Sequence, residues 1–167
     1  MISQESIKDL QQMAGKWFKE NISVSTIDEA EEAILEVSRR LSEAMMSAFG
    51  DQVEPRSTHQ GTRIECSCGS QAEFHGYRER WIRTLCGDIK VKRAYYHCKC
   101  CHSGASPWDK LQGLDERIWS PGLKSLVGEL CARLTYTEAS QLLNRVSRLN
   151  VEESSQQDIV RDLGTRL

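Results

Sequence analysis

The sequence has no apolar run near the length of a membrane-spanning helix, which needs about 20 residues. Its first residues also lack a basic region followed by an apolar core, so we expect no secretory leader. It contains no internal repeat and no low-complexity segment. With 39% hydrophobic and 28% charged residues, the composition predicts a globular cytoplasmic protein, away from membranes and in a reducing compartment.

A strong excess of one charge sign is also missing, because the formal net charge is −2. This disfavours binding of nucleic acid over the whole surface. The charges are uneven, however. Residues 1–60 carry 6 basic against 11 acidic side chains, whereas residues 74–104 carry 7 basic against 2 acidic ones. The second segment permits local contact with DNA, although a solvated hairpin face gives the same pattern.

Cysteine, by contrast, is abundant, with seven residues in the chain. Five of them form two tight clusters about thirty residues apart: Cys66, Cys68, Cys98, Cys100 and Cys101. In a reducing compartment such clusters indicate metal ligands more than disulfides. Two pairs of close sulfurs on either side of a hairpin are typical of a tetrahedral zinc site in a small domain.

We predict that Zn²⁺ binds to one particular set of four thiolates: Cys66, Cys68, Cys98 and Cys101. Spacing favours Cys101 over Cys100 in the second cluster, with Cys100 directed away. Four residues are kept as alternative ligands: Cys100, His75, His97 and His102. Burial as small apolar side chains explains Cys86 and Cys131, but it accounts poorly for the clustered cysteines. A thiol redox role is weaker still, because no Cys-x-x-Cys opens a helix here.

Periodicity predicts an α+β protein that starts with a helical pair over residues 1–50. Apolar residues at spacings of three and four indicate helices over 4–20 and about 27–49. Thr26 and Glu29 form a capping box before the second helix, and Gly50 is expected to end it in a left-handed conformation. Residues 51–62 are polar and read as a linker with a domain boundary.

A zinc ribbon is expected over residues 63–104, with a β-hairpin that turns at 86–88. Residues 105–119 are interpreted as an extended connector anchored by Trp108 and Trp119. A helix-turn-helix-like bundle of three helices should fill residues 120–167, starting with Ser120 as N-cap and Pro121 in the first turn. A second capping box is predicted at 135–138.

Within this bundle, residues 135–144 could form the positioning helix, 149–151 the turn, and 152 onward the helix that contacts DNA. Three polar side chains of this last helix could reach base edges or phosphates: Gln156, Gln157 and Arg161. Glu152, Glu153 and Asp158 oppose this reading, since carboxylates face phosphates poorly. A plain packing module of three helices remains the alternative.

Several runs together resemble the amino-terminal half of ISKra-type insertion-sequence transposases. They are Cys-Ser-Cys-Gly at 66–69, Phe-His-Gly-Tyr-Arg-Glu-Arg at 74–80, and Arg-Thr-Leu-Cys-Gly-Asp-Ile-Lys-Val-Lys-Arg-Ala-Tyr-Tyr-His-Cys at 83–98. Pro-Trp-Asp-Lys-Leu-Gln-Gly-Leu-Asp at 107–115, Ser-Pro-Gly-Leu at 120–123 and Leu-Thr-Tyr-Thr-Glu-Ala-Ser-Gln-Leu-Leu at 134–143 fit the same pattern. The similarity covers about residues 63–163.

This resemblance implies a zinc ribbon followed by a helix-turn-helix that binds transposon ends. In such transposases a catalytic domain of RNase H-like fold follows, in which acidic residues hold magnesium. The sequence ends at Leu167, before such a domain would begin, and no set of three carboxylates stands in a strand-helix context. We therefore expect no nuclease or strand-transfer activity and do not expect an enzyme.

The sequence favours a transposase-derived, zinc-dependent DNA-binding protein associated with the nucleoid. Its expected phosphate contacts in the ribbon are Arg78, Arg80, Arg83, Lys90, Lys92 and Arg93. One alternative is an adaptor that binds a protein partner in a transposition or CRISPR-type nucleoprotein complex, or forms a homodimer, through its amino-terminal helices. Another is an autoregulatory repressor.

Overall fold

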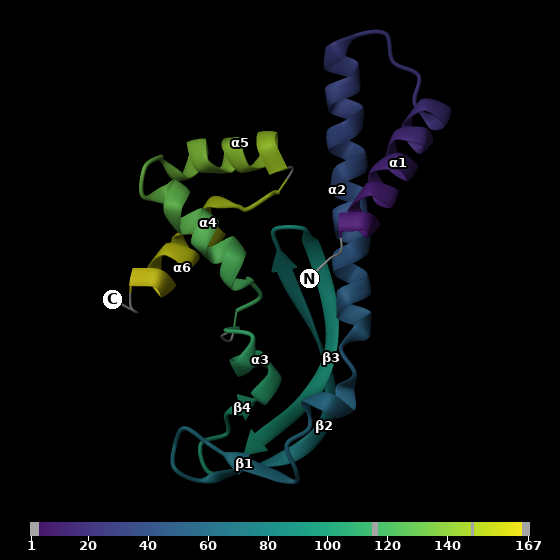
Figure 1. The fold of residues 1–167 in the computed structure, drawn as a ribbon. Helices are drawn as coiled ribbons and strands as arrows, with labels where there is room; N and C mark the ends of the chain where they lie inside the picture. The colour runs from purple at the N-terminus through teal and green to yellow at the C-terminus, as the bar shows by residue number, and fades with distance from the viewer. Residues whose placement is uncertain (1–3, 115–116, 148, 165–167) are drawn as a thin grey trace. The chain divides into compact units, whose positions relative to one another are not determined.

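The computed structural model describes residues 4–114, 117–147 and 149–164. Over these residues the protein has an α+β fold, with six α-helices, a short 3-10 helix and one antiparallel sheet in the order β1-β2-β3-β4 (Figure 1). The chain divides into two compact units, one ending at Arg40 and the other beginning at Leu41. No helix among the described residues is both long and apolar enough to cross a bilayer.

The amino-terminal helices are α1 (Gln4–Asn21) and α2 (Ile27–Gln52). The capping box at the start of α2 is confirmed: the Glu29 N–H donates to Thr26 Oγ1 at 3.2 Å, and the Thr26 N–H donates to Glu29 Oε2 at 3.2 Å. The apolar stripe of α1 stays largely in solvent, with Met13 62% and Trp17 45% exposed. Burial within this unit therefore does not explain why α1 carries an apolar stripe.

The second unit is built on a long hairpin of β2 (Gln71–Thr84) and β3 (Gly87–Cys98). The short strands β1 (Arg63–Glu65) and β4 (Gly104–Ala105) flank it. The turn consists of residues 85–86, whereas the sequence predicts 86–88, because Gly87 and Asp88 already belong to β3 and pair with Thr84 and Arg83. Gly87 has a φ of 111°, which glycine adopts without strain.

Gly50 does not end α2, so the prediction of a left-handed terminus there is wrong. The helix runs on to Gln52, and Gly50 is buried against β3. A Cβ at this position would lie 3.0 Å from the carbonyl oxygen of Lys90. The glycine is therefore required for close packing of the helix on the strand, which its position in the sequence does not reveal.

Residues 51–62 are a packed segment more than a free linker. They contain the 3-10 helix η1 (Pro55–Thr58), whose last residue is only 4% exposed. The N–H of Ala94 on β3 donates to Thr58 Oγ1 at 2.7 Å, and the hydroxyl of Tyr96 donates to the Gly61 carbonyl at 3.0 Å. These bonds tie the segment to the sheet close to the cysteine clusters.

The remaining elements are α3 (Pro107–Leu111), α4 (Pro121–Cys131), α5 (Tyr136–Ser147) and α6 (Glu153–Gly164). Ser120 caps α4 as predicted, since its Oγ accepts the Leu123 N–H at 3.2 Å. The last three helices share one apolar core, made by Trp119, Leu123, Val127, Leu143, Val151 and Ile159. Within this unit, backbone hydrogen bonds from Arg83 to Ile118 and from Ser120 to Arg83 join the hairpin to the bundle.

Candidate metal centre and basic surface

The four predicted cysteines converge at the end of the hairpin that lies away from its turn. The sulfurs of Cys66, Cys68, Cys98 and Cys101 all lie within 4.8 Å of one another. Cys66 Sγ is 3.6 Å from Cys101 Sγ, and Cys68 Sγ is 3.7 Å from Cys98 Sγ. A tetrahedron with metal–sulfur bonds of about 2.3 Å has edges of about 3.8 Å. The cluster therefore has the dimensions of a site that could hold one metal ion, and the separations are too long for disulfides.

Two tight backbone turns present these sulfurs. In the first, the Gly69 N–H donates to the Cys66 carbonyl at 3.0 Å and the Cys66 N–H donates to the Ser70 carbonyl at 2.8 Å. Gly69 has a φ of 82°, a conformation that favours glycine. In the second turn, the Cys98 N–H donates to the Ser103 carbonyl at 2.9 Å. Each cysteine cluster is thus folded back on itself at one end of the sheet.

The local electrostatics differ between the thiols. The backbone N–H of Cys68 and the Ser103 hydroxyl lower the pKa of Cys66 to about 6. The Cys101 N–H pulls the pKa of Cys98 down, but burial and the neighbouring Cys68 and Cys101 thiols outweigh it and raise this pKa to about 11. Cys98 is fully buried. A divalent cation would stabilise all four thiolates, which the protein alone does not do equally.

Ser103 is a site residue that the sequence reasoning missed. Its Oγ lies 2.9 Å from Cys101 Sγ and 3.5 Å from Cys66 Sγ. A hydroxyl at this distance can donate to metal-bound sulfur and so influence the charge on the ligands. The available signal was its position two residues after a predicted ligand.

The alternative ligands lie outside the four-sulfur group. Cys100 is exposed and is not part of it. The imidazoles of His75, His97 and His102 form a row, with ring centroids 6.1 Å and 6.2 Å apart between neighbours. The geometry thus selects the same four residues as the sequence spacing.

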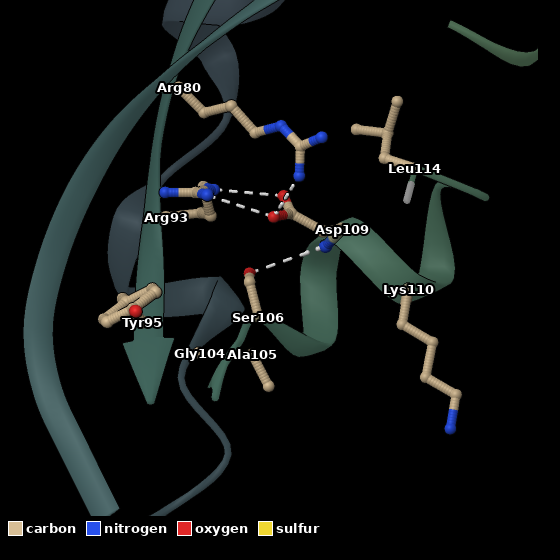
Figure 2. Close-up of a pocket in the computed structure, with 9 residues that line it drawn as sticks. All are labelled: Arg80, Arg93, Tyr95, Gly104, Ala105, Ser106, Asp109, Lys110 and Leu114. Atoms are coloured by element: carbon tan, nitrogen blue, oxygen red, sulfur yellow. Dashed lines mark hydrogen bonds and ion pairs between the residues drawn. The ribbon is translucent and has the colours of Figure 1, made fainter. Parts of the chain in front are cut away.

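Two of the six predicted phosphate contacts are engaged in a buried ion-pair network (Figure 2). The guanidinium of Arg93 donates to both carboxylate oxygens of Asp109 at 3.0 Å, and its third contact is the Arg78 carbonyl at 2.9 Å. Arg80 Nη1 donates to Asp109 Oδ2 at 2.6 Å, and its Nη2 donates to the Arg117 carbonyl. Arg93 and Asp109 are each 7% exposed. These arginines hold α3 on the sheet. They also line a hollow of about 440 Å³, but both guanidiniums are already bound to Asp109 there (Figure 2).

Three other predicted contacts lie on the outer face of the hairpin: Arg83, Lys90 and Lys92. In the register of β2 and β3, Trp81 pairs with Lys90 and Glu79 pairs with Lys92, so these side chains share one face. Lys90 Nζ is 2.7 Å from Glu79 Oε2 and 5.9 Å from the Trp81 ring, which is 59% exposed. Asp88 lies 3.8 Å from Arg83. Two carboxylates, those of Glu79 and Asp88, are therefore close to the three cations on this face.

The sixth basic residue, Arg78, is exposed and stacks on an aromatic ring. Its guanidinium carbon lies 3.8 Å from the centroid of Tyr95. Such a cation–π contact holds the side chain flat against the sheet while leaving its edge open to solvent.

The three candidates on α6 have different surroundings. Gln156 is completely buried, and its Nε2 donates to the Tyr136 and Val151 carbonyls at 3.1 and 3.0 Å and to Ser140 Oγ. It cannot reach DNA from there, and its amide instead joins α5 to α6. Gln157 and Arg161 are exposed, with Arg161 3.5 Å from Asp158.

Comparison with models of known protein families found none that matches this chain, and comparison with curated proteins found no match. The resemblance to ISKra-type transposases therefore stays a hypothesis that depends on the quoted residues. What the structure contributes independently is the four-sulfur cluster, which requires no relative to interpret.

Proposed function

We propose that this chain is a zinc-dependent DNA-binding protein, derived from the amino-terminal part of a transposase and without catalytic activity of its own. The observation that carries the proposal is the tetrahedral spacing of the four cysteine sulfurs at the end of the hairpin. Four thiolates and no remaining position for substrate are typical of a structural zinc site, not a catalytic one. A ribbon of this kind serves as a scaffold for a binding surface.

The proposed DNA contacts of the ribbon are the cations of its outer face. Arg83, Lys90 and Lys92 are exposed there around Trp81. Lys92 has no ion-pair partner among the residues that the structure describes. Lys90 can exchange its carboxylate for a phosphate at little cost, because exposed ion pairs contribute little stability. We leave out Arg80 and Arg93, which serve the buried network around Asp109.

Salt dependence of DNA binding tests this surface. The double variant Lys90→Ala/Lys92→Ala should weaken binding to duplex DNA and reduce the slope of log K against log salt by about 1.8, because each lost phosphate contact contributes about 0.9. Fluorescence anisotropy at several salt concentrations measures both quantities. The matched control Lys16→Ala/Lys19→Ala removes two charges from α1 and should leave the slope unchanged. Equal slopes for wild type and the ribbon variant would contradict this interface.

A second candidate function is that of a protein-binding adaptor, and one observation favours it. Leu10, Met13 and Trp17 on α1 are all more than 40% exposed. Large apolar side chains along one helix are typical of a surface that another chain covers. Sedimentation at micromolar concentration would show whether a second copy covers it, and a Met13→Glu/Trp17→Glu variant should then remain monomeric.

A further inference from the structure

The surface of α5 contains a shallow hollow that the metal centre and the ribbon contacts do not use. It has a volume of about 470 Å³. It is lined by five residues that all have polar side chains: Ser140, Gln141, Asn144, Arg145 and Asn150. Four of these residues belong to α5, and Asn150 lies in the segment before α6. None of the described residues that line it carries a carboxylate.

Three of the side chains that line this hollow lie on one side of α5. Gln141, Asn144 and Arg145 are exposed and occupy positions i, i+3 and i+4 of α5, which lie on one side of a helix. Hydrogen bonds beneath these side chains hold α5 to the segment that follows it. Ser140 Oγ donates to the Val151 carbonyl at 2.8 Å, and the buried Gln156 donates to both groups. The helix and the following segment are therefore held together as one surface.

The functional groups of these three side chains suit the edges of bases in the major groove. The amides of Asn and Gln can form paired hydrogen bonds with N6 and N7 of adenine, and the guanidinium of Arg can do so with O6 and N7 of guanine. A groove about 12 Å wide admits one α-helix. Gln141, Asn144 and Arg145 thus supply three such groups at one helix surface, with one positive charge among them. The nearest carboxylate on this side of α5 is that of Glu138, three residues before Gln141, which accepts hydrogen bonds from the N–H and hydroxyl of Thr135.

The outer surface of α6 is less suitable. Glu152 and Glu153 are exposed at its start, and Glu153 already accepts a hydrogen bond from Thr137 Oγ1 at 2.7 Å. Arg161 is paired with Asp158. The start of α6 thus has two exposed carboxylates, Glu152 just before the helix and Glu153 at its first position, against one, Glu138, in the first turn of α5. Phosphates on either side of the groove repel these carboxylates.

We propose that α5, with Asn150, contacts the base edges of double-stranded DNA, and that α6 positions it through the buried amide of Gln156. This inference rests on the proposed DNA-binding function and reverses the roles that the sequence assigns to the two helices. Gln141, Asn144 and Arg145 determine sequence preference, whereas the lysines of the hairpin supply affinity that does not depend on sequence.

The test uses the full zinc-loaded chain. A preferred duplex is first selected from a random pool of duplexes of about 20 base pairs, two helical turns. Anisotropy then gives Kd for that duplex and for a scrambled duplex of the same composition, at one salt concentration. The double variant Gln141→Ala/Asn144→Ala should reduce the ratio of the two affinities about tenfold or more, because it removes two base contacts. Its binding to the scrambled duplex should be unchanged.

Gln157→Ala is the matched control, an exposed glutamine on α6 whose loss should leave the ratio unchanged. Because Gln141 and Asn144 are also exposed, the α5 variant should unfold at the same temperature as wild type. Loss of preference in Gln157→Ala with retention in the α5 variant would overturn this inference and leave the proposed function intact. Binding of the selected and scrambled duplexes by wild type with equal affinity would also overturn this inference and leave the proposed function intact. Absence of DNA binding by wild type would overturn the proposed function itself.

Discussion

Among single residues, the four clustered cysteines show best how a metal would act on this protein. The pKa of Cys66 is lowered to about 6, while that of Cys98 is raised to about 11. Near neutral pH these two thiols therefore favour different protonation states. Thiolate, and not thiol, is the form that coordinates zinc, so binding has to remove the proton from the buried Cys98. The metal proposal thus depends on four sulfurs acting together.

Replacing Cys98 with serine should abolish zinc binding. The variant Cys98→Ser keeps a similar side-chain size but leaves only three thiolates around a buried hydroxyl. We expect zinc content after purification without chelator to fall from about one equivalent per chain to a small fraction. Elemental analysis by mass spectrometry measures it. Cys100→Ser is the control, because Cys100 is exposed and outside the cluster. A loss of zinc from the control instead would show that the ligand set is wrong.

Gln156 should be needed for stability of the helical bundle and not for contact with DNA. Gln156→Ala removes a fully buried amide that donates to the Tyr136 and Val151 carbonyls and to Ser140 Oγ, and that accepts from Cys131 Sγ, so it deletes four hydrogen bonds and leaves a cavity in the bundle. We expect a loss of about 1–3 kcal/mol in the free energy of unfolding, measured by urea denaturation. The neighbouring Gln157→Ala, an exposed change, should stay within about 0.5 kcal/mol of wild type. Comparable values for the two variants would contradict the role assigned to Gln156.

At the scale of elements, α3 is too short to be stable alone and depends on Asp109 for its place on the sheet. The carboxylate receives hydrogen bonds from Arg80 and Arg93, whose side chains are 13% and 9% exposed. The Asp109→Ala variant leaves both guanidiniums without this partner in a mostly buried site. We expect it to cost about 3–5 kcal/mol in the free energy of unfolding.

The control for this variant is Asp88→Ala on the same sheet. Asp88 is exposed and lies 3.8 Å from Arg83, so its loss should cost about 0–1 kcal/mol. Urea denaturation measures both variants. A small effect for Asp109 would show that α3 is held mainly by the apolar contacts of Trp108 and of Leu114, which follows the helix.

Local signals made part of this architecture predictable. The capping box at Thr26 and the Ser120 cap lie next to the helices that they start, and the spacing of the paired cysteines predicts the four-sulfur cluster. Contacts between distant residues could not be predicted in this way. Gly50 reads as a helix terminus until β3 is placed against it, and Thr58 reads as linker until it binds Ala94.

The basic hairpin shows the same limit. The charge count places Arg80 and Arg93 among the expected phosphate contacts, because both are cations in a predicted strand. Arg93 shares a face of β3 with the buried Val91, which pairs with Arg80, and on this face Asp109, 16 residues beyond Arg93, binds both guanidiniums. A net charge counted along a segment therefore overstates the charge available to a ligand. The face that remains open carries Arg83, Lys90 and Lys92 with two carboxylates among them.

For the molecule as a whole, the unit that begins at Leu41 has its apolar residues in separate clusters. One cluster surrounds the cysteines and consists of Cys66, Ala72, Ala94, Tyr96 and Cys98. The helical bundle has its own core around Trp119 and Leu123. The cysteine-end cluster contains few large side chains, so a metal ion bound there would contribute far more to its stability than to that of the bundle. Removal of zinc should therefore affect the two regions unequally.

Chelation of zinc should unfold the cysteine end of the hairpin while the bundle of α4, α5 and α6 persists. Hydrogen exchange followed by mass spectrometry separates the two: we expect protection to disappear at Ala72 and Tyr96 and to remain at Leu123 and Ile159, which lie in the bundle core. Most of the helical far-UV circular dichroism should also remain. The control is the Cys98→Ser variant without chelator, which should show the same pattern because it lacks the metal for a different reason. Uniform loss of protection across the unit would show that it unfolds as one cooperative structure. Unchanged protection at the cysteine end would show that this region folds without a metal.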